Sequence, residues 1–189
     1  TMFFKDPNSG ELLGDRIENV TGEAIWANDN KTVFYVSKDP ETLRAAKVMK
    51  HILGTPASED KLIYDETDET FAVGLGKTKS KKYITIVSNQ TLTAEVRLID
   101  ADKPDGRVVV FEPRKVDHLY SVEHLNGNFV IYTNADGAKN FKLMSCPENK
   151  TGMANWKEVI PHRSDVLLEN FEVFDNYLVA HEMIKGLTK

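Results

Sequence analysis

The chain has 189 residues, of which 41% are hydrophobic and 28% charged, a balance that is typical of a soluble globular protein rather than a disordered one. A formal net charge of −5 at pH 7 provides no positive field for a phosphate backbone, so no nucleic-acid partner is expected. The single cysteine, Cys146, cannot form an intrachain disulfide, and no segment has the roughly 18 apolar residues that a membrane helix requires.

Strand-forming runs begin early in the chain, and residues 1–20 have the pattern of the tail of a preceding unit. Between about residues 21 and 66, strands are expected at 23–26, 33–36, 47–52 and 62–64. A Gly-Thr-Pro turn at 54–56 leads into the last of these strands, and acidic residues follow it. One helical turn is also compatible with 40–48, where acidic and basic residues mix.

The same order of strands returns in two further complete units and in one that is incomplete. The second unit, about 70–112, has expected strands at 70–75, 83–87, 94–99 and 107–111. The third unit, about 118–161, has them at 118–123, 129–132, 141–146 and 156–160. A fourth unit, within 166–189, has strands at 167–173 and 177–180 and stops after the second.

The spacing of these units predicts the fold. Phe34, Tyr83, Phe129 and Tyr177 mark the second strand of each unit, and the steps between them are 49, 46 and 48 residues. Four-stranded antiparallel sheets that repeat at this interval are typical of β-propeller blades, which pack face to face around a central channel. We therefore expect an all-β partial β-propeller with three complete blades and a partial blade at each end.

Propellers close with four to eight blades, so this chain is expected to be a fragment of one propeller domain. Blades at the ends of such a fragment leave apolar strands and strand edges uncovered, and self-association is therefore expected.

The residues also carry a family resemblance, which runs from about residue 21 to 187. EAIWAND at 23–29, HILGT at 51–55 and EDKLIYDE at 59–66 resemble the propeller domain of the prolyl oligopeptidase family, most closely its oligopeptidase B (protease II) group. Further matches are VFY at 33–35, EVRLID at 95–100, DHLYSV at 117–122 and TNADGAKNF at 133–141.

This resemblance implies a serine peptidase in which the propeller caps an α/β-hydrolase domain. Oligopeptidase B-like enzymes cleave short peptides after Arg or Lys, so the implied partners are the parent's own hydrolase domain and short basic peptides. The hydrolase domain carries its serine on a G-x-S-x-G elbow, and this chain contains no such motif. No catalytic, cofactor-binding or metal-binding residue is therefore assigned, no cofactor is expected, and the fragment is expected to be inactive.

Two function classes remain open: the gating propeller of such a peptidase, and a stand-alone propeller that serves as a protein-interaction scaffold. The sequence at 1–7, TMFFKDP, has no signal-peptide pattern, so a cytoplasmic location is expected.

Several groups of residues have weaker functional interpretations. His118 and His124 would share one strand face, but two imidazoles without a third ligand are a weak metal site. His51, His162 and His181 are expected at the surface or as hydrogen-bonded strand residues. Trp26 and Trp156 are expected to fill space between blades.

Two charged segments have a structural and a functional interpretation. The lysines at 77, 79, 81 and 82 are expected at a solvated hairpin tip, with a contact to the hydrolase domain or substrate as the alternative. The acidic residues Asp60, Asp65, Glu66, Asp68 and Glu69 are expected to solubilise a connection between blades, or else to attract basic peptides to the channel.

Overall fold

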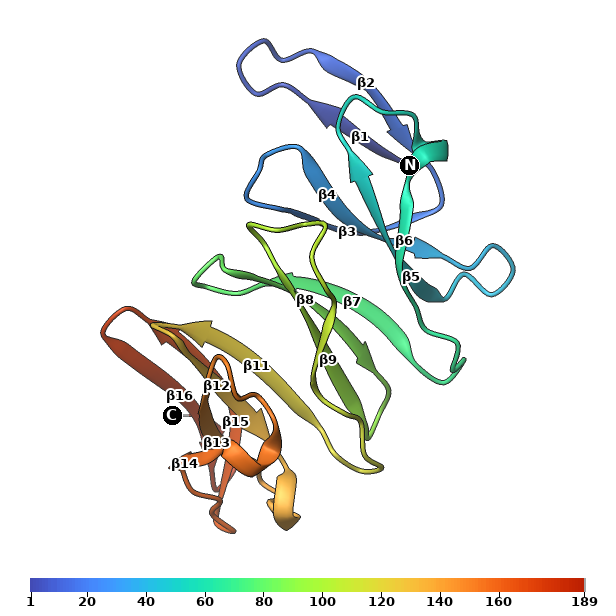
Figure 1. Ribbon diagram of the computed structural model, residues 1–189. Helices are drawn as coiled ribbons and strands as arrows, with labels where there is room; N and C mark the ends of the chain where they lie inside the picture. The colour runs from blue at the N-terminus through green and yellow to red at the C-terminus, as the bar shows by residue number, and fades with distance from the viewer. Residues whose placement is uncertain (189) are drawn as a thin grey trace.

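The computed structural model describes residues 1–188 as five antiparallel sheets that follow one another along the chain (Figure 1). We call these sheets blades A to E. Blade A has β1 (Met2–Lys5) and β2 (Leu12–Ile17). Blade B has β3 (Val20–Trp26), β4 (Thr32–Lys38), β5 (Ala45–Ile52) and β6 (Lys61–Asp65).

The remaining blades repeat this arrangement. Blade C has β7 (Ala72–Lys77), β8 (Tyr83–Asn89), β9 (Ala94–Asp100) and β10 (Val109–Glu112). Blade D has β11 (Tyr120–Leu125), β12 (Asn128–Thr133), β13 (Lys142–Pro147) and β14 (Lys157–Ile160). Blade E has β15 (Val166–Phe174), β16 (Tyr177–Ile184) and β17 (Leu187–Thr188).

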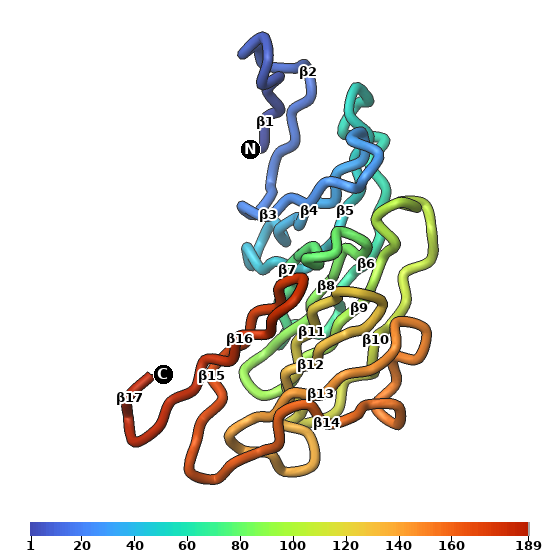
Figure 2. Tube along the Cα trace, turned by 90° about the vertical axis from the view of Figure 1, so that its left-hand side faces the viewer, coloured from blue at the N-terminus to red at the C-terminus, as the bar shows by residue number. Residues whose placement is uncertain are grey.

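The expected fold class is confirmed: the blades pair their strands in sequence order, and no sheet closes on itself. The described residues contain no α-helix, only the short 3-10 turns η1 (Ala57–Glu59), η2 (Ala135–Gly137) and η3 (Met153–Asn155). None of residues 1–188 lies in a helix that is long and apolar enough to cross a membrane. Figure 2 shows the blades one after another, with first strands on the left and fourth strands on the right in blades B and C.

One local expectation was partly correct and one was wrong. A single turn forms at 39–43, where the Leu43 backbone N–H donates to the Asp39 carbonyl at 3.0 Å, but it does not continue, because Leu43 adopts a φ of 60°. The chain then enters β5 at Ala45. Blade E does not stop after its second strand, because the short strand β17 pairs with β16.

The hydrophobic core lies between the blades, since the second strands of blades B, C and D are covered on both sides. Phe34 on β4 packs with Ile84 and Ile86 on β8 in the cluster between blades B and C. Phe129 on β12 packs with Phe111 on β10 in the cluster between blades C and D. Strands buried on both sides are apolar at consecutive positions, which is why the second strands are the clearest signal in the sequence.

The blades present two ends to their surroundings, which differ in the segments that form them. The linker face carries the loops between second and third strands (39–44, 90–93, 134–141) and the inter-blade linkers (66–71, 113–119, 161–165). The hairpin face carries the first-to-second loops (27–31, 78–82, 126–127) and the third-to-fourth loops (53–60, 101–108, 148–156). The β4–β5 loop and the linker that follows β6 lie on the right-hand side of Figure 1.

The outermost strand pairs share an irregularity. The pairing of third and fourth strands shifts register at Val48/Met49 in blade B, at Val110/Glu112 in blade C and at Leu143/Met144 in blade D. Each complete blade therefore has an irregular outer strand pair at a comparable place, as β-bulges produce.

A close approach within blade C gives a testable prediction. Gly76 on β7 pairs with Thr85 on β8, and a Cβ atom at Gly76 would lie 2.7 Å from the Thr85 Oγ1 atom. Gly76→Ala is expected to lower the free energy of unfolding by about 1–3 kcal/mol, because the core must shift to admit the methyl group. Chemical denaturation measures this loss, which should be smaller in a Thr85→Ala background. Equal losses in both backgrounds would contradict the clash.

Candidate functional site

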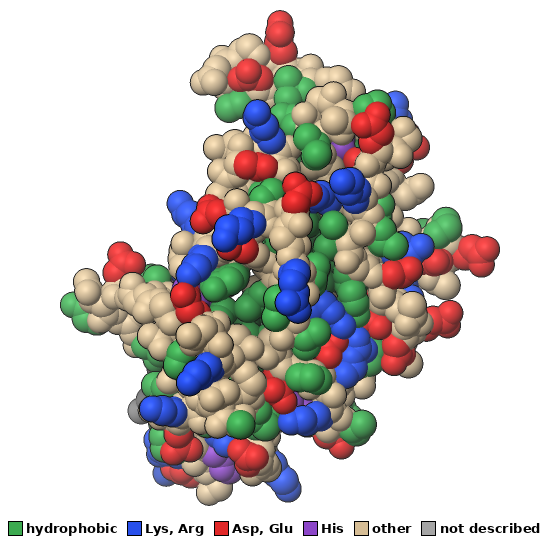
Figure 3. Space-filling model, in the orientation of Figure 1, with side chains coloured by type: hydrophobic (Ala, Val, Ile, Leu, Met, Phe, Trp, Pro, Cys, Tyr) green, Lys and Arg blue, Asp and Glu red, His purple; other side chains and the backbone are tan. Residues whose placement is uncertain are grey.

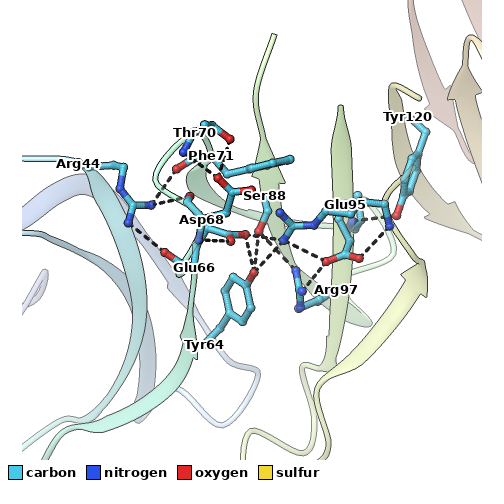
Figure 4. A network of polar contacts seen from close by, with 12 residues as sticks. Arg44, Tyr64, Glu66, Asp68, Thr70, Phe71, Ser88, Glu95, Arg97 and Tyr120 are labelled. Atoms are coloured by element: carbon cyan, nitrogen blue, oxygen red, sulfur yellow. Dashed lines mark hydrogen bonds and ion pairs between the residues drawn. The ribbon is translucent and has the colours of Figure 1, made fainter. Parts of the chain in front are cut away.

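Polar contacts connect neighbouring blades at both faces of the molecule. At the linker face, Arg44 from the β4–β5 loop holds the linker between blades B and C (Figure 4). Its guanidinium donates to the carbonyl oxygens of Glu66 at 3.0 Å, Phe71 at 2.9 Å and Asp68 at 3.4 Å. Since five N–H donors are fixed in one plane, arginine suits such a cluster of acceptors.

The Arg44 clamp predicts a measurable stability effect. Arg44→Met keeps much of the apolar stem but removes the donors, and is expected to lower the free energy of unfolding by about 1–3 kcal/mol. The linker at 66–71 should also become more sensitive to limited proteolysis. Arg16→Met is the control, because Arg16 is exposed and contacts the exposed Glu18 and the ring of Phe3, and such surface pairs contribute about 0–1 kcal/mol. Equal effects of the two substitutions would contradict the clamp.

A buried ion pair continues this network toward blade D. The Glu66 carboxylate is 3% exposed and accepts hydrogen bonds from Arg114 and from the Tyr64 hydroxyl, both at 2.6 Å. Burial by itself would raise the pKa of Glu66, but the hydrogen bonds from Arg114, Tyr64 and Ser88 lower the pKa to about 2. Glu66 is therefore a firmly ionised structural carboxylate.

Alternating charges extend from this pair into blade C. Arg114 lies 4.1 Å from the ring centre of Phe71 and also contacts Glu95, at 3.4 Å. Glu95 pairs in turn with Arg97, whose guanidinium lies 3.9 Å from the ring centre of Tyr64. The network thus joins the linker after blade B, the strands of blade C and the linker before blade D. Arg114 and Arg97 each also lie over an aromatic ring.

The hairpin face has a serine, a histidine and a carboxylate in one chain of hydrogen bonds. His124 Nδ1 lies 2.8 Å from the Ser80 Oγ atom, and His124 Nε2 lies 3.0 Å from a Glu148 oxygen. Ser80 also accepts a hydrogen bond from the Lys82 backbone N–H, and Lys82 pairs with Glu148 at 2.8 Å. Although these residue types occur in catalytic triads, the contacts lock the β7–β8 hairpin of blade C onto blade D.

A second buried histidine joins blades A and B. His51 is fully buried and lies between two aspartates, with Nδ1 2.7 Å from Asp60 and Nε2 3.0 Å from Asp15. Tyr35 donates to the other Asp60 oxygen at 2.7 Å, and the ring of Phe4 stacks on the imidazole. Because Asp15 lies on β2, this group ties the first sheet to blade B.

The two histidines that were expected to share a strand face bind different partners. His118 precedes β11, and its Nε2 lies 3.0 Å from the Thr133 Oγ1 atom, whereas His124 bonds with Ser80 and Glu148. Burial lowers the pKa of both imidazoles. Across residues 1–188, no three His, Cys, Asp or Glu side chains lie together in a possible metal-binding arrangement.

The lysine-rich loop is a hairpin tip, but its contacts are more extensive than a solvated loop requires. Lys77 donates to the Trp26 carbonyl of blade B at 2.7 Å, and Lys82 pairs with Glu148 of blade D. Lys79 lies 3.9 Å from Glu172 and over the ring of Phe174, both in blade E. The loop therefore connects blade C with three other blades.

The acidic residues do not gather into one cluster. Asp60 and Glu66 are engaged with His51 and Arg114, whereas the Asp68 carboxylate accepts hydrogen bonds from Thr70. Asp65 lies 3.8 Å from Lys47 with both side chains exposed. The expected solvation of this segment holds for the exposed Asp65, Asp68 and Glu69 and is wrong for Asp60 and Glu66, whose side chains are buried in polar contacts.

The two tryptophans also differ. Trp156 is 9% exposed and packs against Phe111 and Tyr120 between blades C and D, as expected. Trp26 is 39% exposed and contacts the edge of the Phe4 ring. The expectation that Trp26 fills space between blades was therefore only partly correct, because more than a third of its surface is exposed.

Polar contacts join neighbouring blades at both faces, and we call the Arg44, Glu66–Arg114, Ser80–His124–Glu148 and Asp15–His51–Asp60 groups the polar locks. Successive four-stranded blades joined in this way define a segment of a β-propeller. The chain belongs to the prolyl oligopeptidase family, since the family model described as the prolyl oligopeptidase N-terminal β-propeller domain matches residues 1–189.

Individual relatives agree with this assignment. The chain is 43% identical to dipeptidyl aminopeptidase BI of Pseudoxanthomonas mexicana over 187 residues, which are 99% of this chain and 26% of the relative. It is 34% identical to protease 2 of Moraxella lacunata over 191 residues, covering 100% of this chain and 27% of the relative. The chain thus spans about a quarter of the length of these relatives.

Solved structures give the same result. Oligopeptidase B from Leishmania major superposes with a TM-score of 0.89 at 34% identity, over 97% of this chain and 26% of that one. Oligopeptidase B from Trypanosoma brucei, with covalently bound antipain, superposes with a TM-score of 0.85 at 31% identity, over 93% of this chain and 25% of that one.

Proposed function

We propose that this chain is the propeller segment of an oligopeptidase B-like serine peptidase that cleaves short peptides after Arg or Lys in the cytoplasm. The observation that carries the proposal is the match of the whole chain to the family's N-terminal propeller, together with the TM-score of 0.89 to an oligopeptidase B. In this proposal, the parent's α/β-hydrolase domain supplies the serine, histidine and aspartate.

The proposed role of the propeller is to restrict access to that catalytic domain. Polar contacts between neighbouring blades at both faces support this role, because they hold the blades in a fixed arrangement. A wall of this kind admits short flexible peptides and excludes folded proteins by size. Bond cleavage itself is assigned to the hydrolase domain.

The purified full-length parent protein is tested with three substrates. A short arginyl or lysyl peptide with a blocked amino terminus should be cleaved, and a folded protein rich in surface Arg and Lys should not. A serine-directed inhibitor should abolish the cleavage of the peptide. The third substrate is a dipeptide ester or amide with a free amino terminus, because one relative is named a dipeptidyl aminopeptidase. Cleavage of this last substrate alone would overturn the proposed cleavage after Arg or Lys within blocked peptides.

Failure to cleave any of these peptides would instead favour the stand-alone interaction scaffold. The isolated chain Thr1–Lys189 serves as the negative control and should be inactive, because it has no G-x-S-x-G nucleophile motif. Turnover by this material, free of contaminants, would contradict the assignment of catalysis to the hydrolase domain.

Self-association of the isolated chain is also part of the proposal. Apolar side chains are exposed on both terminal blades, including Phe3 at 55% and Leu12 at 66% on blade A, and Tyr177 at 76% and Leu187 at 66% on blade E. Such uncovered sheets favour association. Light scattering should show a mass that rises with concentration, whereas a constant monomer mass would contradict this expectation.

A further inference from the structure

Blades A and B are joined through buried titratable side chains. His51 on β5 is 0% exposed, and the side chains of Asp15 on β2 and Asp60, just before β6, are 7% and 2% exposed. On the face seen in Figure 3, by contrast, charged side chains of both signs are spread over the surface, where water solvates them. The Asp15–His51–Asp60 lock has little access to water, so its charges depend on the hydrogen bonds within the group.

Both ring nitrogens of His51 face carboxylate oxygens. Nδ1 lies 2.7 Å from Asp60 Oδ1, and Nε2 lies 3.0 Å from Asp15 Oδ1. A neutral imidazole has one N–H group and one lone pair, whereas an imidazolium has two N–H groups. A neutral His51 would therefore direct a lone pair at one of the two carboxylates across a hydrogen-bond distance. Only the imidazolium donates to both.

The surroundings keep both carboxylates in the role of acceptors. The Asp15 oxygen also accepts a hydrogen bond from the Gly54 backbone N–H at 2.6 Å, and the second Asp60 oxygen accepts one from the Tyr35 hydroxyl at 2.7 Å. Burial by itself would raise the pKa of Asp15, but the hydrogen bonds from Gly54 and His51 lower it. Burial and the bond to Asp60 raise the pKa of Tyr35, which therefore remains a donor.

The other neighbours of the imidazole do not supply a competing charge. Phe4 on β1 stacks on the ring, with the ring centres 5.6 Å apart. Lys50 precedes His51 on β5, and successive side chains of a strand point to opposite faces of the sheet. Lys50 accordingly pairs with Asp105 of blade C. Among the contacts of residues 1–188, the charged groups that face His51 are thus the two aspartates.

The histidine between blades C and D shows the alternative arrangement. His124 Nε2 lies 3.0 Å from Glu148, but its Nδ1 lies 2.8 Å from the Ser80 hydroxyl. Because a hydroxyl can donate as well as accept, a neutral imidazole satisfies both contacts. Burial also lowers the pKa of His124, which favours the neutral form. The two histidines hold neighbouring blades together in similar ways but need different numbers of protons.

We propose that the joint between blades A and B is a proton-dependent lock, in which Asp15 and Asp60 hold His51 as an imidazolium and loss of its proton releases blade A. When the joint opens, His51 meets water and loses its second N–H above the ordinary histidine pKa of about 6.5. A proton that is bound more firmly in the closed joint stabilises that joint fully below this value, and the stabilisation falls as the pH rises. Opening should therefore become about tenfold more frequent for each pH unit above about 7.

Hydrogen–deuterium exchange in the full-length parent tests the proposal between about pH 6 and about 9, a range in which tyrosine and lysine keep their protons. Mass spectrometry follows exchange in residues 2–17, which include β1 and β2, and in residues 120–133, which include β11 and β12 beside His124. The ratio of the two rates removes the base catalysis of exchange, which acts on both segments. Because amide exchange is the readout, the result does not depend on peptidase activity.

The ratio is expected to rise about tenfold for each pH unit above about 7, because only the joint between blades A and B requires the extra proton. A ratio that stays constant over the whole range would overturn the proton-dependent lock. This wild-type profile decides the question even if a variant does not fold.

Two variants separate the role of the proton from that of packing. In Asp60→Asn, the amide N–H can donate to Nδ1 of a neutral His51 while the amide oxygen accepts from Tyr35. This variant should keep the wild-type ratio at about pH 7 and hold it constant up to about pH 9. In His51→Gln, the side chain cannot donate to both carboxylates, so the ratio should be raised about tenfold at every pH. A wild-type rise with pH in either variant would contradict the proposal.

Discussion

Phe129→Ala is expected to lower the free energy of unfolding by about 3–5 kcal/mol, which is the usual loss for truncation of a fully buried phenylalanine. Phe129 is 0% exposed on the central strand β12. Its ring meets Phe111 edge-on at 4.9 Å and lies 5.3 Å from the ring of Tyr83. Since these partners belong to blade C, the cavity would open between blades C and D.

Chemical denaturation of the wild-type and variant proteins measures this loss. Phe174→Ala is the matched control, because Phe174 is 47% exposed on the terminal blade and should cost less than about 1 kcal/mol. Similar losses for the two variants would show that the interface between blades C and D contributes little to cooperative folding. The Phe129 variant should also expose the inter-blade surface to hydrophobic dyes at lower denaturant concentrations.

Glu66→Gln is expected to lower stability at pH 7 by about 2–3 kcal/mol, because it removes the charge that compensates Arg114. The pKa of Glu66 is about 2 in the folded state against an ordinary value of 4.5. A lowered pKa stabilises the fold above the ordinary value, and the stabilisation is lost as the pH falls from 4.5 toward 2. The shift corresponds to about 3 kcal/mol in total.

The difference in stability between wild type and Glu66→Gln should therefore be constant from pH 7 to about 5 and should shrink as the pH falls below 4.5. Urea denaturation at several pH values measures it. Glu69→Gln is the control, since Glu69 is an exposed carboxylate in the same linker and its replacement should change stability by less than about 0.5 kcal/mol. A pH-independent difference for Glu66→Gln would show that its ionised form contributes nothing specific.

The repeat was visible in the sequence for a physical reason. Second strands such as Thr32–Lys38 and Tyr83–Asn89 lie between two neighbouring blades, so both of their faces require apolar side chains. Because each blade repeats that environment, Phe34, Tyr83 and Phe129 recur at nearly equal intervals. The turns between strands could also be predicted from the sequence, since Asn30 and Asn126 adopt positive φ values that asparagine tolerates.

The polar locks could not be predicted in the same way. Glu66 and Arg114 are 48 positions apart, and Ser80 and His124 are 44 apart, so their meeting depends on how successive blades are placed beside each other. Charged residues in loops give no periodic signal, and solvation of the acidic segment at 60–69 was the simplest interpretation. The turn expected at 40–48 is limited to 39–43, because Leu43 adopts a φ of 60° and β5 begins at Ala45, and the mixed charges of this segment indicate neither feature.

The recurring register shifts between third and fourth strands have a consequence for how these molecules meet one another. An outermost strand with free N–H and C=O groups is a template for pairing with the same strand of another copy, and a local bulge twists that template out of line. Val109 and Val159 on these fourth strands remain solvent-exposed, yet the register shifts make continuous pairing with a strand of another copy unfavourable. Fibril growth through the fourth strands is accordingly disfavoured, and aggregates should form through the exposed sheets of blades A and E.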